Sequence, residues 1–266
     1  MIHLRSIQKK EIREADVFPF NVPVIRALHE IEFRAPVTFF VGENGSGKST
    51  LMEAIACAIG SVTVGSQSVN TDPSLEQMRK LAQYLRLVWT KRTLKGFFLR
   101  AEDFFGYAKQ ITQTRQELES DLSNVDKDYV GRSQLAKDLA KLPYRNEVGA
   151  LKRRYGDGLD ARSHGEGFMA LFQSRFVSGG LYLLDEPEAP LSPLRQLSFL
   201  SALKQMITED AQFIIATHSP IILAFPEAQI LNFSDGEIRK VEYAELEHVT
   251  LTKEFLNNPG AYLRNL

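Results

Sequence analysis

Nine consecutive residues near the start of the chain have the types and spacing that bind a nucleotide's phosphates. They are Gly42, Glu43, Asn44, Gly45, Ser46, Gly47, Lys48, Ser49 and Thr50, in the pattern G-x-x-x-x-G-K-[ST]. Glycines let the backbone curl until successive N–H groups point at an anion, and the helix that follows adds its positive dipole end. In this pattern Lys48 reaches the β- and γ-phosphates and the Ser49 hydroxyl binds Mg²⁺. The loop therefore predicts a site for nucleotide phosphates and Mg²⁺.

Two acids follow an apolar run later in the chain. Residues 181–184 are typical of a buried parallel strand, and Asp185 and Glu186 stand at its carboxyl end, where open α/β sheets bind ligands. Asp185 is therefore predicted as a second ligand of Mg²⁺, and Glu186 as the group that polarises an attacking water. A solvated turn is the alternative, which the apolar strand disfavours.

A histidine stands at the end of another predicted buried strand, residues 212–217. A lone histidine is usually a hydrogen-bonded structural residue. At this position, in a chain with a phosphate-binding loop, we expect His218 to sense the γ-phosphate. That role needs only a neutral imidazole that donates one hydrogen bond.

A second anion site is predicted ahead of an apolar helix at residues 168–176. Ser163, His164, Gly165 and Glu166 lead into that helix, and a serine and a glycine at a helix start favour anion binding. One nucleotide does not need two such sites. The second site is therefore expected to bind a phosphate held by another copy of the chain.

These residues must be positioned by alternating strands and helices, which predicts an α/β fold with a mixed central sheet. Strands are expected at residues 2–7, 22–28, 30–33, 36–41, 95–100, 181–184, 212–217, 229–233 and 237–241. Helices are expected at residues 50–59, 75–87, 102–115, 133–142, 168–176, 193–207, 251–256 and 260–266. No heptad repeat is sustained, so no long inserted coiled coil is expected.

Composition indicates a soluble globular protein of one large domain, with 266 residues of which 44% are hydrophobic and 24% charged. No run reaches the roughly 18 apolar residues of a membrane helix. The single cysteine, Cys57, permits no internal disulfide, which favours a reducing cytoplasm. We expect Cys57 to be a small core residue rather than a redox switch.

The net charge of −1 is unevenly spread. Residues 79–154 hold 17 Lys and Arg against 9 Asp and Glu. This excess has two interpretations, a surface for nucleic-acid phosphates or a solvated helical face.

Together these motifs make the sequence resemble the ABC-type ATPases over essentially its whole length. The resemblance assigns residues 42–50 to Walker A, 183–187 to Walker B, 188–192 to the D-loop, 217–219 to the switch histidine and 163–166 to the signature. It implies ATP and Mg²⁺ as ligands, and an ATP-dependent homodimer. It also implies a single domain over 1–266, with a basic, mainly helical lobe inserted at 61–162 and closing elements at 163–266.

Within that superfamily the signature looks SMC-like, because it ends in Glu166. More narrowly, residues 163–166 together with 185–189 and 216–220 resemble the stand-alone predicted AAA-type, SMC-like, non-transporter ATPases of bacteria. Two residues depart from the usual signature: Arg162 replaces a leucine, and His164 replaces the first glycine. The usual glutamine between Walker A and the signature is not clear. Arg100 or Glu102 occupies its place.

Four functions are compatible with these residues. The first is an ATPase switch in which two subunits enclose two ATP molecules, and the second is a DNA- or RNA-associated ATPase in repair or phage defence. A transporter motor is disfavoured by the SMC-like signature, and a nucleotide-bound scaffold for an effector protein is the fourth. An aromatic residue at Phe18 or Phe20 is expected either to stack on adenine or to pack the edge of the sheet.

Overall fold

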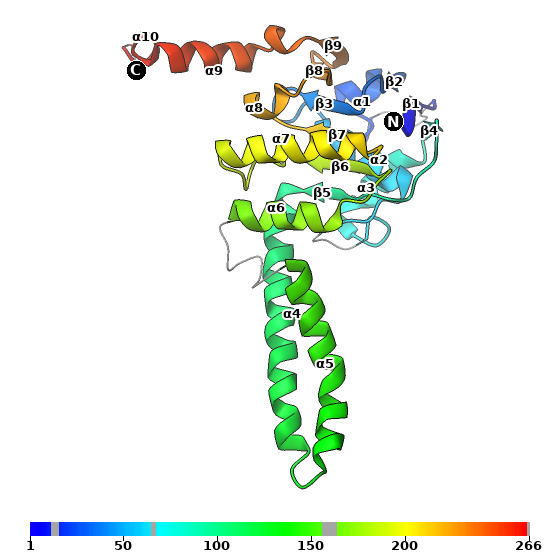
Figure 1. Ribbon diagram of the computed structural model, residues 1–266. Coiled ribbons are helices and arrows are strands. Elements are labelled where there is room, and N and C mark those ends of the chain that lie inside the picture. The colour runs from blue at the N-terminus through cyan, green and yellow to red at the C-terminus, as the bar shows by residue number, and fades with distance from the viewer. Residues whose placement is uncertain (12–15, 65–67, 156–163, 265–266) are drawn as a thin grey trace.

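A six-stranded mixed sheet forms the centre of the computed structural model, which describes residues 1–11, 16–64, 68–155 and 164–264 (Figure 1). The strand order is β5-β6-β7-β3-β8-β9. The strands are β3 (Val37–Val41), β5 (Phe98–Arg100), β6 (Leu181–Asp185), β7 (Gln212–Ala216), β8 (Gln229–Ser234) and β9 (Glu237–Val241). All neighbours are parallel except β8 and β9. The carboxyl ends of β3, β6 and β7 therefore meet at one edge, and the predicted mixed α/β fold is confirmed.

A smaller antiparallel sheet, in the order β2-β1-β4, covers part of one face. It consists of β1 (Leu4–Lys9), β2 (Glu30–Glu32) and β4 (Leu85–Trp89). The buried side chain of Gln212 links it to the main sheet: its oxygen accepts from the N–H groups of His3 and Leu4 at 2.8 Å each, and its amide donates to the Leu4 carbonyl. These bonds pair the buried side-chain amide of Gln212 with the backbone of β1 and the residue before it.

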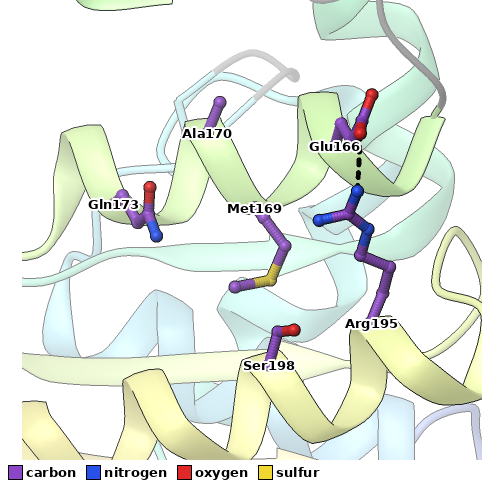
Figure 2. Close-up of a pocket in the computed structure, with 6 residues that line it drawn as sticks. All are labelled: Glu166, Met169, Ala170, Gln173, Arg195 and Ser198. Atoms are coloured by element: carbon purple, nitrogen blue, oxygen red, sulfur yellow. Dashed lines mark hydrogen bonds and ion pairs between the residues drawn. The ribbon is translucent and has the colours of Figure 1, made fainter.

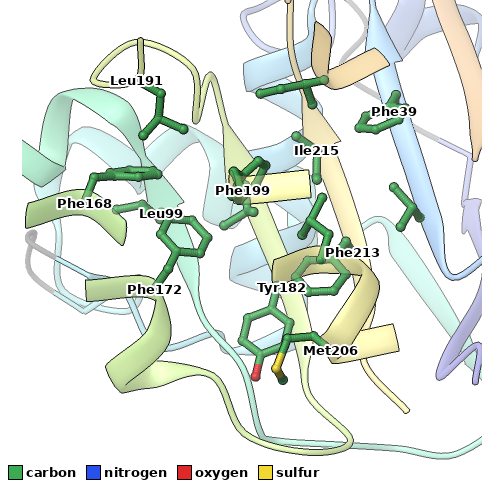
Figure 3. Packing of buried hydrophobic residues seen from close by; sticks show 14 of the residues in the cluster. Phe39, Leu99, Phe168, Phe172, Tyr182, Leu191, Phe199, Met206, Phe213 and Ile215 are labelled. Atoms are coloured by element: carbon green, nitrogen blue, oxygen red, sulfur yellow. The ribbon is translucent and has the colours of Figure 1, made fainter. Parts of the chain in front are cut away.

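The central strands β3, β6 and β7 are buried at every residue, because helices lie on both faces of the main sheet. The helices are α1 (Pro23–Ala27), α2 (Lys48–Ile59), α3 (Glu76–Ala82), α4 (Ala101–Asp128), α5 (Gln134–Tyr155), α6 (His164–Arg175), α7 (Pro193–Thr208), α8 (Pro220–Leu223), α9 (Glu247–Asn257) and α10 (Pro259–Leu263), with 3-10 turns at Pro73–Leu75 and Tyr243–Glu245. Neighbouring strand residues alternate between the faces. Phe39 belongs to the core under α6 and α7, where Phe172 and Phe199 pack (Figure 3), whereas Phe40 belongs to the core under α2.

The long helices α4 and α5 form a hairpin that projects away from the sheet (Figure 1). The prediction of two short helices at 102–115 and 133–142, with no long inserted coiled coil, was wrong about the helix lengths, because α4 has 28 residues and α5 has 22. Phe104, Ala108 and Val125 supply buried apolar contacts along α4. Ile111, Leu118 and Leu122 continue this face as half-buried residues, and side-chain pairs at i,i+4 such as Arg115 with Glu119 add to the stability of the helix.

The hairpin does not carry the positive charge that the sequence suggested. Residues 101–155 hold 10 Lys and Arg against 9 Asp and Glu, whereas residues 79–100 hold seven cations and no acid. The latter stretch includes β4 and β5, which belong to the two sheets. The predicted basic helical lobe at 61–162 therefore divides into a nearly neutral hairpin and a basic edge of the main body.

Two further secondary-structure predictions were wrong. Residues 22–28 were expected as a strand but contain α1, because Pro23 occupies a first-turn position that favours a helix. The helix expected at 75–87 ends at Ala82, and the residues after it form β4. There the pairing of β4 with β1 outweighs the local helical pattern.

Candidate functional site

The phosphate-binding loop connects β3 to α2, as its pattern predicts. Gly42, Gly45 and Gly47 all have positive φ, at 144°, 81° and 98°. At Gly47 a Cβ atom would lie 2.6 Å from a methyl of Val24 on α1. A larger residue at Gly47 would therefore collide with α1 as well as strain the backbone.

Lys48 is buried at the start of α2 and lies over its own loop. Its ammonium donates to the carbonyls of Gly42 at 2.7 Å and Glu43 at 2.8 Å. Burial lowers the pKa of Lys48, and the nearby charges of Asp185 and Glu186 oppose that shift. Of the other loop residues, Glu43, Asn44, Gly45 and Ser49 are exposed, and Ser46 and Thr50 are half-buried. The loop thus presents its cation and its exposed backbone at the same place.

Asp185 ends β6 and is 8% exposed. The Ser49 hydroxyl hydrogen-bonds its carboxylate, while its Oδ1 atom has no hydrogen-bond partner among the described residues. Burial raises the pKa of Asp185 to about 6, because the charged form is poorly solvated there. A carboxylate and a hydroxyl are hard oxygen ligands, so Ser49 and Asp185 fit Mg²⁺ chemically.

Glu186 follows Asp185 with a φ of 51°, which is uncommon for a residue with a side chain. Its N–H donates to the Ala216 carbonyl of the neighbouring strand at 2.9 Å, which holds this conformation. The carboxylate is half exposed and lies 3.9 Å from His218 Nε2. Such strain, of order 1–3 kcal/mol, clusters at functional sites.

His218 follows β7 and lies beside the two acids. Its backbone N–H donates to Glu188 Oε1 at 2.7 Å, whereas its Nε2 atom is buried with no hydrogen-bond partner among the described residues. Burial, followed by the charge of Lys48, lowers the pKa of His218. The imidazole is therefore mainly neutral at pH 7, the form that the γ-phosphate-sensing prediction requires.

The predicted second anion site lies on α6, apart from the chain's own loop. Ser163 lies outside the described residues, and His164 begins the helix. A Cβ atom on Gly165 would lie 3.2 Å from the Pro190 carbonyl, so α6 starts against the D-loop. The Glu166 carboxylate pairs with Arg195 of α7 at 2.5 Å (Figure 2). The structure thus brings together residues 42–50, Asp185, Glu186 and His218, and separates Glu166 from them.

Arg100 forms ion pairs with three carboxylates. It is one of two candidates for the position of the usual glutamine. It ends β5 beside Asp185. Its guanidinium lies 2.8 Å from Asp103, 3.0 Å from Glu53 and 3.6 Å from Asp72. Sequence reasoning did not identify these three acids: Glu53 and Asp72 are distant in the sequence, and Asp103 is a local i,i+3 partner that was overlooked. The other candidate, Glu102, lies in the first turn of α4.

Three smaller expectations concern residues around the site. Phe20 is buried against Tyr84 with ring centroids 5.4 Å apart, so it packs the core. Phe18 is 49% exposed, and its stacking on adenine stays a prediction. Burial raises the pKa of Cys57 to about 11, which keeps the thiol protonated and unreactive, as expected for a packing residue.

Comparisons with known proteins agree with this geometry. A family model described as AAA domain matches residues 20–153. The macrolide export ATP-binding/permease protein MacB from two Psychrobacter species, P. cryohalolentis and P. arcticus, is 26% identical over 236 residues, covering 83% of this chain and 31% of each relative. The chain spans 40% or less of the curated relatives that it matches.

Among solved structures, the Smc head domain of Pyrococcus furiosus, with an extended coiled coil and bound to the C-terminal domain of ScpA, is similar with a TM-score of 0.50. That match has 13% identity and covers 96% of this chain and 100% of the Smc chain. At this identity the likeness concerns the fold. In the part of the chain that the structure describes, no helix has both the length and the apolar character to cross a membrane.

Proposed function

The chain belongs to the AAA domain family and has the fold of ABC-type P-loop ATPases, and on that premise we propose that it is an ATP-driven switch. It binds ATP with Mg²⁺, dimerises around two ATP molecules and opens when they are hydrolysed. One observation carries the proposal: Lys48, Asp185, Glu186 and His218 converge where β3, β6 and β7 end.

Each of these side chains has a separate role. The loop N–H groups and Lys48 hold the β- and γ-phosphates, and Ser49 and Asp185 hold Mg²⁺, which offsets phosphate charge when bound. Glu186 is the half-exposed carboxylate nearest to His218, so it orients and deprotonates the attacking water. His218 donates a hydrogen bond to the γ-phosphate from its buried, unpaired Nε2.

The proposed dimer is based on residues 163–166, a predicted anion-binding segment that does not belong to the chain's own phosphate-binding loop. The start of α6 rests on the D-loop, beside the edge that holds His218. In a two-fold dimer formed across this edge, residues 163–166 of one subunit face the loop 42–50 of the other. The helix start and Ser163 then complete the partner's phosphate site.

Light scattering of Glu186→Gln tests this arrangement. The substitution keeps the shape of the side chain and removes its charge, so ATP stays bound and unhydrolysed. We expect twice the monomer mass with ATP and Mg²⁺, and a lower mass with ADP. Adding Ser163→Arg should restore the monomer without removing ATP binding. We call the proposed dimer around two ATP molecules the ATP sandwich. A monomer in ATP, or an equally stable dimer without nucleotide, would contradict the sandwich.

A second candidate, nucleic-acid sensing in DNA repair or phage defence, is favoured by the basic edge of the main body. Arg86, Lys91, Arg92 and Lys95 are exposed, and no acid lies between residues 79 and 100. Such a cluster attracts phosphates and releases counterions on binding.

Duplex DNA affinity measured against salt tests this candidate. We expect a steep fall between low and moderate salt, and a weaker, flatter response in Lys91→Glu/Arg92→Glu. Arg153→Glu tests the hairpin in the same assay, and basal ATP turnover with and without DNA separates a sensor from a scaffold. Salt-independent binding, or no binding, would show that these cations form a solvated surface and not a nucleic-acid site.

A further inference from the structure

The last two helices, α9 and α10, form an arm (residues 247–263) that extends beyond the main body (Figure 1). All residues from 250 to 264 are exposed. The arm folds on itself, since the rings of Phe255 and Tyr262 meet at 5.8 Å and the Tyr262 hydroxyl donates to Glu254. Its large exposed apolar side chains are Leu251, Phe255, Leu256, Tyr262 and Leu263.

An arm of this size needs a surface to pack on. Helices of 11 and 5 residues are marginal in water by themselves, because helices in proteins are stabilised mainly by burying an apolar face. Near its root the arm buries Val249, but the five large apolar side chains beyond it are 37–72% exposed. An exposed patch of this kind marks an interaction site.

A second exposed apolar surface lies on α7 of the same chain. Leu194 and Leu197 are 73% and 55% exposed. Beside them, α6 and α7 enclose a groove of about 440 Å³ whose lining includes Met169, Arg195 and Ser198 (Figure 2). We call this combined surface the α7 face. It offers both apolar contact and a hollow for side chains.

The arm and the α7 face flank the same edge of the molecule. At the arm's root, His248 lies close enough to His218 for their charges to interact, and the Tyr243 hydroxyl just before the arm donates to the Pro220 carbonyl. His218 in turn binds Glu188 of the D-loop, which leads into α7. The arm's root and the start of α7 therefore both border the edge across which the proposed dimer forms, so an arm that extends over this edge reaches the partner's α7.

We propose that each arm packs its apolar side chains onto the α7 face of a second copy of this chain when the ATP-bound dimer forms. The inference rests on the proposed function and deepens it. In a two-fold dimer the arm of each subunit covers the α7 face of the other, so both pairs of apolar surfaces are buried. The arm's root beside His218 joins the exchange directly to the γ-phosphate site.

The first test is the dimer mass of Glu186→Gln in ATP and Mg²⁺ after Phe255→Asp/Leu256→Asp is added. We expect dimer affinity to fall on the order of 100-fold, because two apolar side chains per arm lose their burial. ATP affinity should not change. Both residues are exposed, so the unfolding midpoint should stay close to that of the parent Glu186→Gln protein. Leu94→Asp, a 75% exposed leucine between β4 and β5, is the matched control and should keep the dimer.

The second test is disulfide crosslinking in the same Glu186→Gln background with Cys57→Ala. One chain carries Leu256→Cys and the other Ser198→Cys. Oxidation of the mixture with ATP should give a covalent dimer that neither chain forms alone. Crosslinking within a chain that carries both substitutions, at monomer mass, would show that the arm packs on its own α7 and overturn the exchange.

The outcomes separate this inference from the sandwich itself. An ATP dimer that survives Phe255→Asp/Leu256→Asp overturns the exchange, leaves the sandwich standing and assigns the arm to another protein. A Glu186→Gln protein that stays monomeric in ATP overturns both. A dimer that needs no nucleotide but dissociates on the arm substitutions supports the exchange and contradicts the sandwich.

Discussion

Two clusters of buried charge lie side by side where β5 and β6 end, and they differ in how far their groups are paired. Around Arg100, three carboxylates surround one guanidinium. Around Asp185, by contrast, Asp185 Oδ1 and His218 Nε2 have no hydrogen-bond partner among the described residues. The two clusters are neighbours, because Arg100 and Asp185 are paired in the strand register.

The difference distinguishes a structural cluster from a binding site. A buried polar group without a partner costs free energy, so unpaired groups persist where a ligand completes them. The paired cluster stabilises the free protein, and in the proposed switch the unpaired one binds ATP and Mg²⁺. Substitutions in the two clusters should therefore have opposite consequences for stability and for binding.

The largest effect is expected from Arg100→Met. Removing the guanidinium leaves Glu53, Asp72 and Asp103 close together without the cation that pairs with all three, so unfolding free energy should fall by about 3–5 kcal/mol. Urea unfolding measures this loss. Arg239→Met is the control, since its pair with Glu237 is exposed and worth little. Equal losses of unfolding free energy in the two variants would show that the Arg100 cluster stabilises the fold no more than an exposed ion pair.

Glu186→Gln should come next, with the effect confined to chemistry. Loss of a positioned base slows turnover by on the order of 10²-fold or more. ATP affinity and unfolding free energy should stay close to wild type, because the side chain is half exposed. Steady-state kinetics measures the loss of turnover, and equilibrium titration with ATP measures the affinity. Unchanged turnover would remove Glu186 from the reaction.

Lys48→Ala should act on binding. The lost ammonium supplies charge-assisted hydrogen bonds to the phosphates, so ATP affinity should weaken roughly 10- to 100-fold. Isothermal titration measures it. In the free protein Lys48 bonds two carbonyls of its own loop, so stability should change less than in Arg100→Met. Unaltered ATP affinity would refute the assignment of the loop.

The smallest effect, and one of opposite sign, is expected from Asp185→Asn without nucleotide. Burial raises the pKa of Asp185 from 3.8 to about 6, so its charge destabilises the fold increasingly as pH rises from about 4 through 6. The variant should gain about 1–2 kcal/mol at pH 7.5 and almost nothing at pH 4. It should also lose the extra stability that ATP with Mg²⁺ gives wild type. Unfolding at both pH values measures the difference.

The sequence predicted the unpaired cluster better than the paired one. The loop at 42–50, the acids after β6 and His218 after β7 follow short-range patterns, because each motif joins a buried strand to its turn. Arg100 meets Glu53 and Asp72 through tertiary packing, which no local spacing records. The hairpin was missed for another reason: the apolar face of α4 is interrupted at Arg115 and continues only through the widely spaced Leu118, Leu122 and Val125, which polar neighbours obscure in the sequence.

The length of α4 has a mechanical consequence. Its 28 residues extend about 42 Å at 1.5 Å per residue, and its first turn carries Asp103, which the Arg100 cluster fixes to α2 and β5. A rotation of about 10° at that base would displace the far end by about 7 Å, if the hairpin turns as a rigid lever. Because α2 begins at Lys48, a small adjustment around the phosphates is geometrically amplified at the tip.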